Sequence, residues 1–433
     1  MDLSHRRRGV APDRQLGAAE GGTGGVPRPR GPWGDPGRAG GGRRAARSRH
    51  RGRRGVHARG RGPGLAVTSA EEFIPAVRLD NEDVWETLAP RLRDLVVHGR
   101  FILGPELEEF EREAAKVFGC EWAVGTSSGT SALLLALRAA PLEPGARVAL
   151  PTNTFYATFE AVVMAGYEPV LVDHDADYLL DPATVADLDL QAVVAVHLYG
   201  LPVDMTALMS LARDRGWWVL EDCSQSHGAT VAGRPAGSLG DAGAFSAYPT
   251  KNLGAWGDAG FVTGSDPELF EEIRSLRHHT QRQANVHLGL GGTERLDNLQ
   301  ALVLSEKLRR LPEEVERRRM IGAWYRDALD GMELVLPGDR GDRTHVYHQF
   351  VVRVPDRYGV RERMGELGVG TGIHYPTPIH LQPGASDRFE APAHFARAEA
   401  SMHEILSLPM FVTLTQGEVD RVASTLRRAI GKG

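Results

Sequence analysis

Lysine is scarce in this chain. Only four of its 51 basic residues are lysines, at positions 116, 251, 307 and 432, and arginine supplies the rest. Arginine keeps its proton at any physiological pH, so a position that needs a neutral amine requires lysine. Small and turn-forming residues flank Lys251 between Asp241 and Asp258. This pattern suits an amine that attacks a carbonyl group, although a solvated loop lysine has the same local sequence.

Cysteine and long apolar runs are also scarce. Cys120 and Cys223 are the only cysteines and lie far apart in the sequence, which excludes a zinc-ligand spacing or a disulfide framework. We therefore expect a reducing, cytoplasmic environment. No apolar run of about 18 residues occurs, and no apolar core follows the first arginines. The sequence thus predicts neither a transmembrane helix nor a secretory signal.

Acidic residues are scarce only at the N-terminal end. Before Leu65 there are 16 basic and four acidic residues, which leaves 35 basic and 52 acidic residues in the remainder. Such an acidic remainder is unlike a nucleic-acid-binding protein, which presents a large basic face. We therefore expect no nucleic-acid partner for the body of the protein.

Residues 1–66 are rich in arginine, glycine and proline and lack apolar periodicity. Such a segment buries too little surface to offset its ordering entropy, so the sequence predicts a disordered extension. The extension either contacts nucleic acid or an acidic partner, or arises from a start site assigned too early. The absence of interleaved aromatic residues favours the second interpretation.

The middle of the chain alternates short apolar runs with helical patterns. This alternation predicts an α/β fold with a mostly parallel sheet covered by helices on both faces. We assign residues 67–333 to an N-terminal segment and a large domain, and residues 334–433 to a smaller α+β domain. The expected sheet strands are Arg147–Leu150, Glu168–Asp173, Ala192–His197 and Trp217–Asp222. We also expect residues 269–311 to be helical, with one loop at residues 289–293, and residues 370–375 to form a strand of the smaller domain.

Polar residues gather where these strands are expected to end. Asp222 ends one strand, and Phe155 follows another. A stretch rich in serine and threonine, residues 126–131, leads into the strong helical pattern that continues to Leu137. Backbone N–H groups at the start of such a helix suit a phosphate, although serine and threonine also simply cap helices. Because ligands bind beyond the carboxyl ends of parallel strands, we expect these features to converge.

Six blocks of sequence occur in order along the chain. They are Gly125–Leu133, Pro151–Thr158, Glu221–Ala229, Phe245–Gly254, Arg295–Asp297 and His374–His380. Together these blocks resemble the DegT/DnrJ/StrS family of sugar aminotransferases. The resemblance extends from about Ile74 to the C-terminus, and the third and fourth blocks are the most specific.

The resemblance implies a fold type I scaffold, like that of aspartate aminotransferase, with pyridoxal 5'-phosphate as cofactor. Lys251 matches the lysine that forms a Schiff base with the cofactor and later acts as general base and acid. Asp222 matches the carboxylate that pairs with the pyridine nitrogen. Phe155 matches the aromatic residue that stacks on the ring, although it could also be an ordinary core phenylalanine.

Further matches concern the rest of the site. Gln225 matches an amide beside the ring hydroxyl. His374 and Tyr375 match a motif near the sugar-nucleotide pocket, and His374 could equally be a structural histidine. The phosphate-binding residues of the family match Gly129, Thr130 and Ser246.

The resemblance also implies a homodimer with the active site at the interface between its subunits. At the position where the family often places an asparagine that reaches the partner's phosphate, this chain has Thr293. A threonine hydroxyl can donate a hydrogen bond but extends less far than an asparagine amide. The sequence therefore leaves open whether Thr293 reaches across to the partner.

The sequence predicts an enzyme that passes an amino group, with glutamate as the expected donor, to a keto group of a nucleotide-linked deoxysugar. Transfer to a keto-cyclitol is an alternative within the same class. A protein that binds the cofactor without turnover is an alternative from another class, and a nucleic-acid binder acting through the N-terminal extension is a third. No metal site is expected.

Overall fold

The computed structural model describes residues 73–283, 285–391 and 394–431. The predicted extension, residues 1–66, lies outside the described residues. Those described belong to one compact unit, Thr68–Gly433. The predicted boundary between a large and a small domain near residue 334 stays a prediction.

Seven strands form a central sheet in the order β1-β9-β8-β5-β4-β2-β3. From β8 to β3 every neighbouring pair is parallel, whereas β9 is antiparallel to both β1 and β8. The predicted mostly parallel sheet is therefore confirmed. Its strands are β1 (Trp122–Thr126), β2 (Arg147–Pro151), β3 (Glu168–Val172), β4 (Ala192–Val196), β5 (Trp218–Asp222), β8 (Ala242–Ser246) and β9 (Gly260–Gly264).

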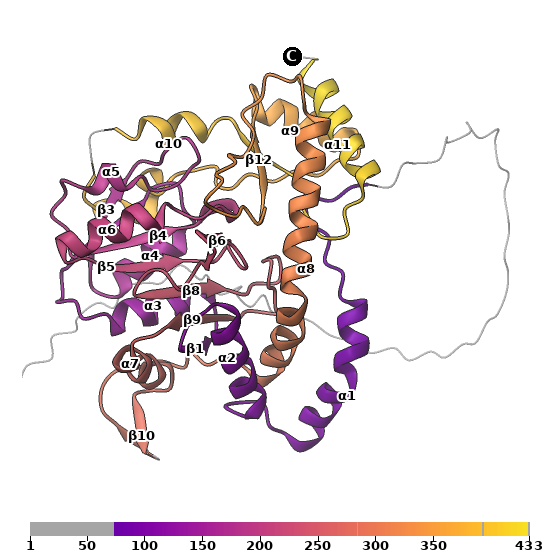
Figure 1. Cartoon of the computed structure of the whole chain (residues 1–433). Helices are drawn as coiled ribbons and strands as arrows, with labels where there is room; N and C mark the ends of the chain where they lie inside the picture. Colours follow the sequence, from indigo (N-terminus) through magenta and orange to yellow (C-terminus); the bar gives the residue numbers. More distant parts are fainter. Residues whose placement is uncertain (1–72, 284, 392–393, 432–433) are drawn as a thin grey trace, which may run out of the picture. The chain divides into compact units, whose positions relative to one another are not determined.

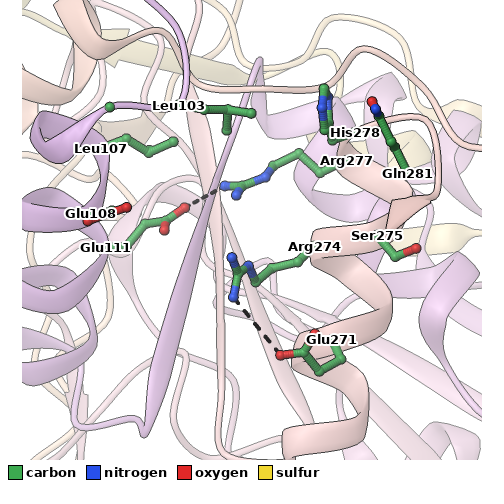
Figure 2. A pocket seen from close by; sticks show the side chains of 11 residues that line it. Leu103, Leu107, Glu108, Glu111, Glu271, Arg274, Ser275, Arg277, His278 and Gln281 are labelled. Carbon is green, nitrogen blue, oxygen red and sulfur yellow. Dashed lines mark hydrogen bonds and ion pairs between the residues drawn. The ribbon is translucent and has the colours of Figure 1, made fainter. Parts of the chain in front are cut away.

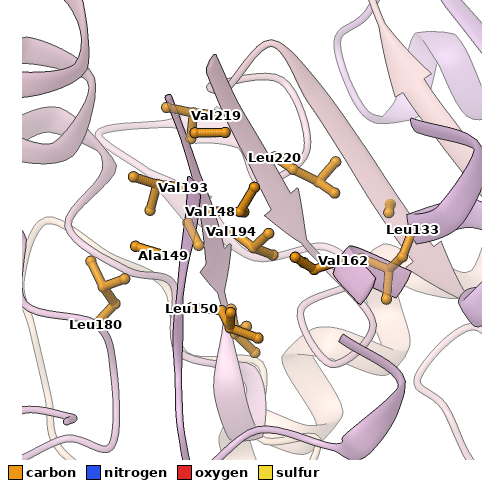
Figure 3. Packing of buried hydrophobic residues seen from close by; sticks show 14 of the residues in the cluster. Leu133, Val148, Ala149, Leu150, Val162, Leu180, Val193, Val194, Val219 and Leu220 are labelled. Carbon is orange, nitrogen blue, oxygen red and sulfur yellow. The ribbon is translucent and has the colours of Figure 1, made fainter. Parts of the chain in front are cut away.

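Apolar residues fill both faces of this sheet. All five residues of β4 are buried, as expected for a central strand covered by helices on both sides. Figure 3 shows valines and leucines of β2, β4 and β5 packed together, with Leu133 and Val162 contributed by the helices that cover them. The continuous apolar runs of the sequence therefore become interior strands, and this core fixes the position of each strand end.

Helices connect and cover the strands (Figure 1). Ser128 caps the helix after β1 by accepting a hydrogen bond from the backbone of Ser131, and Asp204 caps another helix in the same way. The helices before residue 278 are α1 (Glu82–His98), α2 (Pro105–Val117), α3 (Gly129–Ala139), α4 (Tyr156–Met164), α5 (Pro182–Val185), α6 (Met205–Arg215) and α7 (Pro267–Arg277).

The long helix α8 (Asn298–Ala328) connects two parts of the fold. It packs against α1 and α2, and also against α11 (Gln416–Ile430), which lies beside its C-terminal half in Figure 1. A separate apolar core forms there around Tyr325, Phe350 and Phe411. Its other elements are β12 (Phe350–Arg353), α9 (Arg357–Glu366) and β13 (Ile405–Leu408). Helix α10 (Ala396–Ser401) packs instead against the core of the central sheet through Ala398.

Two stretches differ from the sequence-based expectation. Residues 269–311 were expected to be helical with one loop, but α7 ends at Arg277 and the hairpin β10 (Gln281–Gln283) and β11 (Val286–His287) follows. Helix α8 then continues past Pro312, because its packing outweighs the roughly 3 kcal/mol that an interior proline costs.

The second difference is the expected strand at residues 370–375. This segment forms no strand and only a single bridge, from Gly372 to Ser407. Prolines at 376 and 378, together with two glycines, disfavour a regular ladder there. The segment instead brings His374 and Tyr375 toward the end of the central sheet.

Among the residues that the structure describes, no helix combines the length and the hydropathy needed to cross a bilayer.

Candidate active site

One cavity, of about 340 Å³, lies beyond the carboxyl ends of the central strands. Strands β1, β4, β5 and β8 all point to this edge, and α3 and α4 begin there. The structure brings together around it all nine site residues that the sequence suggested: Gly129, Thr130, Phe155, Asp222, Gln225, Ser246, Lys251, His374 and Tyr375.

Lys251 lies in the loop after β8. Its backbone N–H donates to the carbonyl of Tyr248 (2.8 Å), which forms a tight turn. Burial lowers the pKa of Lys251 to about 8, although the carboxylate of Asp222 opposes this shift. Within the described residues, no hydrogen bond or ion pair engages its amine. The site therefore holds an amine that loses its proton nearer neutral pH than an exposed lysine does.

Asp222 is the last residue of β5 and is 4% exposed. One carboxylate oxygen accepts a hydrogen bond from the hydroxyl of Thr158 (2.8 Å), and the other accepts one from the backbone of Ser224 (3.1 Å). These contacts fix the direction of the carboxylate. The pair of Asp222 and Lys251 thus places a fixed anion and a reactive amine in one cavity.

The phosphate-binding turn predicted at Gly129 is formed by two elements that meet closely. A Cβ added at Gly129 would come within 2.4 Å of the Cβ of Ser246, so only glycine allows α3 to begin against the end of β8. Gly129 and Thr130 are the first two residues of α3, where free N–H groups and the positive end of the helix dipole meet. This arrangement fits a phosphate group.

Phe155 stands at the start of α4 with 54% of its surface exposed. Its ring lies 5.4 Å from that of Tyr375, at an angle of 42°. The alternative of an ordinary core phenylalanine is therefore wrong for Phe155, because a core residue would be buried. Its exposed ring is available to stack on a planar ligand.

Gln225 links two segments at the floor of the cavity. Its side-chain oxygen accepts a hydrogen bond from the backbone of Tyr199 (2.7 Å), and its amide nitrogen donates to the hydroxyl of Tyr375 (3.2 Å). Burial raises the pKa of Tyr375, so its phenol stays protonated. The hydroxyl oxygen of Tyr375 accepts the hydrogen bond from Gln225, so the O–H of Tyr375 remains free to donate to a ligand.

His374 contacts Ser407 through Nδ1 (2.8 Å). Burial and the nearby Lys251 lower the pKa of His374 to about 4, so the imidazole is neutral at physiological pH. The hydrogen bond with Ser407 is typical of a structural histidine. The place of His374 in the lining of the cavity is typical of a ligand-binding residue. Both interpretations therefore remain compatible with its geometry.

Among the further residues that line the cavity, sequence reasoning gave no role to Thr158, His348 and Gln349. Thr158 closes the Pro151–Thr158 block, so its place in that block was the available signal. No local pattern marked the other two, because they come from the segment before β12 and only the fold brings them to Lys251.

The hydroxyl of Thr293 forms a hydrogen bond with Nε2 of His279 (2.8 Å). Thr293 itself is exposed. The neighbouring Glu294 reaches the start of α3, where its carboxylate accepts hydrogen bonds from Ser127 (2.7 Å) and Ser131 (2.5 Å). The sequence left open whether Thr293 contacts a partner's phosphate, and that question stays open.

A second cavity, of about 550 Å³, lies between α2 and the end of α7 (Figure 2). Arg277 points into it and donates to Glu111 (2.5 Å) and to the carbonyl of Gly125 (3.0 Å). Arg274 faces Glu271 at 4.0 Å. This cavity is larger, but it contains no lysine, and its charges are mostly matched within the protein.

Residues 83–427 match the model of the DegT/DnrJ/EryC1/StrS aminotransferase family. The chain belongs to this family. Its aminotransferases depend on pyridoxal phosphate, which agrees with the cofactor inferred from the sequence.

Two similar proteins are named for their substrates. The UDP-N-acetyl-3-dehydro-alpha-D-glucosamine 3-aminotransferase of Acidithiobacillus ferrooxidans is 40% identical over 76% of this aminotransferase and 90% of its own length. The dTDP-3-amino-3,4,6-trideoxy-alpha-D-glucose transaminase of Streptomyces venezuelae is also 40% identical, over 76% of this chain and 88% of its own.

A solved structure is similar as well. DesV of S. venezuelae, crystallised with a ketimine intermediate, superposes with a TM-score of 0.78 and 38% identity. The match covers 83% of this chain and 98% of DesV. The fold type I assignment is therefore confirmed.

Proposed function

We propose that this aminotransferase passes an amino group to a keto group of a nucleotide-linked sugar, with glutamate as the donor. The observation that carries the proposal is the single cavity in which the Lys251 amine, the Asp222 carboxylate and the start of α3 meet. The names of the two similar proteins support nucleotide-linked sugars as the substrate class. They differ in the nucleotide, so the proposal leaves UDP and dTDP open.

The residues of the cavity suit pyridoxal phosphate. Gly129, Thr130 and Ser246 would hold its phosphate, and Asp222 would pair with its ring nitrogen. The exposed ring of Phe155 would cover one face. When bound, the cofactor supplies an aromatic electron sink beside the reacting carbon.

The protein's own part in the reaction is to hold groups and move protons. The lowered pKa of Lys251 supplies a neutral amine that attacks a carbonyl and later takes and returns a proton at Nζ. The Thr158 hydroxyl and the Ser224 N–H hold the carboxylate of Asp222 in position. The neutral His374 adds no positive charge that would compete with Lys251.

We further propose a homodimer. Phe101, Ile102 and Leu103 form a consecutive run in which each residue is more than 40% exposed, and Leu290 near the β10–β11 hairpin is 87% exposed. Exposed apolar residues of this kind are typical of an interface. Sedimentation equilibrium of the purified protein tests this, and a monomer at micromolar concentration would contradict it.

A cytoplasmic location is part of the proposal. Cys120 and Cys223 are both free thiols, which suits a reducing compartment. Fractionation of the producing cell tests the location, and recovery outside the cytoplasm would contradict it.

The substrate is tested by incubating the purified protein, loaded with pyridoxal phosphate, with glutamate and a panel of keto compounds. The panel contains UDP- and dTDP-linked keto sugars and a keto-cyclitol, and mass spectrometry and NMR identify the product. Amination of a nucleotide-linked sugar supports the proposal. Amination of the cyclitol alone, or of nothing, would contradict it.

A further inference from the structure

The segment His348–Gln349 faces the Lys251 cavity from the side of β12. Two backbone hydrogen bonds clamp it to the turn after β4, from Val346 N–H to the carbonyl of Gly200 (2.9 Å) and from Gln349 N–H to that of Tyr199 (3.2 Å). A Cβ on Gly200, whose φ is +103°, would lie 2.9 Å from the nitrogen of His348. The segment therefore sits on the same rigid turn that orients Gln225.

Hydrogen bonding fixes the tautomer of His348. The amide nitrogen of Asn252 donates to the carbonyl of Val346 (3.1 Å), which can only accept. The amide oxygen of Asn252 must then face Nδ1 of His348, 3.2 Å away. Because that oxygen can only accept, Nδ1 carries the proton.

The second nitrogen of His348 is therefore an acceptor. Burial, with the nearby charge of Lys251, lowers the pKa of His348 well below its ordinary value, so the ring is neutral. A neutral imidazole protonated at Nδ1 carries a lone pair at Nε2. None of the described residues forms a hydrogen bond with that nitrogen.

Gln349 provides a second uncommitted acceptor. Its side-chain oxygen is buried, and no hydrogen-bond partner for it exists in the described part of the chain. Buried polar atoms normally have a partner, so an orphan acceptor beside a cavity indicates a ligand that donates. Gln349 lines the Lys251 cavity beside His348, and it also lines a small neighbouring cavity formed with Tyr178 and His345.

The cofactor does not supply the missing donors. Its phosphate carries acceptor oxygens, and Asp222 and Gln225 match the residues that bind the ring nitrogen and ring hydroxyl. The substrates carry such donors, as a sugar hydroxyl or as the ammonium group of the amino donor.

We propose that His348 and Gln349 form a substrate-binding pair whose two neutral acceptors take hydrogen bonds from hydroxyl or ammonium groups of the substrate. This inference rests on the proposed function, because it assigns the pair to that reaction's substrates. It adds two residues on the β12 side to those that the sequence motifs suggested.

The test compares His348→Phe and Gln349→Leu with wild-type protein in two binding experiments. Glutamate binding is read from the absorbance change of the loaded protein in the first half-reaction. Sugar binding is read by calorimetry with UDP-N-acetylglucosamine and dTDP-glucose, which carry hydroxyls but no keto group and so cannot react. Gln349→Glu retains an acceptor oxygen and is the conservative variant.

His345→Phe is the matched control. His345 is buried in the same segment and accepts a hydrogen bond from the backbone of Tyr347 (3.0 Å), but it does not line the Lys251 cavity. We expect it to bind both probes as wild-type protein does. Its behaviour separates loss of a ligand contact from disturbance of the segment.

We expect His348→Phe and Gln349→Leu each to weaken binding about tenfold, and Gln349→Glu to restore most of it. Weakening of glutamate alone identifies the ammonium as the donor, and weakening of the sugars alone identifies a hydroxyl. Unchanged binding of both probes would overturn the proposal, as would loss of cofactor binding in both variants but not in His345→Phe.

Failure of the proposed function gives a different result. If neither glutamate nor any other amino donor changes the absorbance of the wild-type protein, the aminotransferase proposal is refuted. Calorimetry with the sugars would still test the pair of His348 and Gln349. Wild-type protein that binds neither probe would overturn both.

Discussion

The two cavities differ in how far the protein satisfies the groups that line them. In the larger one, between α2 and α7, Arg277 is paired with Glu111 and Arg274 faces Glu271. In the smaller one, the Lys251 amine, Nε2 of His348 and the buried oxygen of Gln349 have no partner among the described residues. The larger cavity also has one unpaired donor, Nε of Arg277, but the charge of Arg277 is paired with Glu111. The unpaired amine and acceptors of the smaller cavity, more than its volume, therefore mark the ligand site.

The largest expected effect concerns Lys251. Lys251→Ala removes the only amine of the cavity, so we expect loss of the absorbance of the lysine-bound cofactor and a fall in kcat of about 10,000-fold or more. Absorbance and steady-state kinetics measure both.

Arg274→Ala in the larger cavity is the matched control, because it removes a cation whose pair with Glu271 is half-exposed. It should leave cofactor absorbance and kcat unchanged. An equal loss of cofactor absorbance and kcat in Lys251→Ala and Arg274→Ala would contradict the assignment of the active site to the smaller cavity.

The next effect concerns charge at Asp222. Asp222→Asn keeps the size of the side chain but removes the anion that faces Lys251, and we expect kcat to fall by about 1,000-fold. Thr158→Val removes only one neutral hydrogen bond to that carboxylate, so a loss of about fivefold is expected. Steady-state kinetics with saturating glutamate measures both, and a larger effect at Thr158 than at Asp222 would contradict the assignment.

A substitution in the larger cavity should lower the stability of the folded protein. Arg277 is 4% exposed, and Arg277→Met leaves the partly buried Glu111 without its partner. We expect a loss of about 3 kcal/mol in the free energy of unfolding, measured by urea denaturation, with cofactor absorbance retained. A stable variant that no longer binds the cofactor would place this cavity in the active site.

The smallest effect is a pH dependence. Burial puts the pKa of Lys251 at about 8, below the 10.5 of an exposed lysine, so the neutral amine increases tenfold per pH unit up to about pH 8. The rate at which cofactor-free protein captures pyridoxal phosphate should rise likewise and level off above that pH. A rate that still rises tenfold per unit at about pH 9.5 would contradict the lowered pKa.

The same shift has a consequence for stability. Because the folded-state pKa of Lys251 lies below its unfolded value, the folded protein prefers the neutral amine. Its contribution to the free energy of unfolding is therefore least favourable below pH 8 and improves as pH rises toward 10.5.

The sequence predicted those site residues that lie within short, continuous sequence motifs. Lys251 and Gly129 each follow a strand and Asp222 ends one, and the strand ends of one parallel sheet lie close together. His348 and Gln349 escaped prediction because their place depends on the turn at Gly200, about 150 residues earlier, which no local pattern reveals. The expected strand at residues 370–375 was wrong because glycines and prolines prevent a ladder.

The central claim is that nitrogen passes from an amino donor to a nucleotide-linked sugar through Lys251's cavity. Loaded protein is mixed with ¹⁵N-glutamate, freed of excess donor, and then given the UDP- and dTDP-linked keto sugars. The account predicts one ¹⁵N atom per active site in an aminated sugar, and none with Lys251→Ala. Wild-type protein that transfers no label to any nucleotide-linked sugar would contradict it.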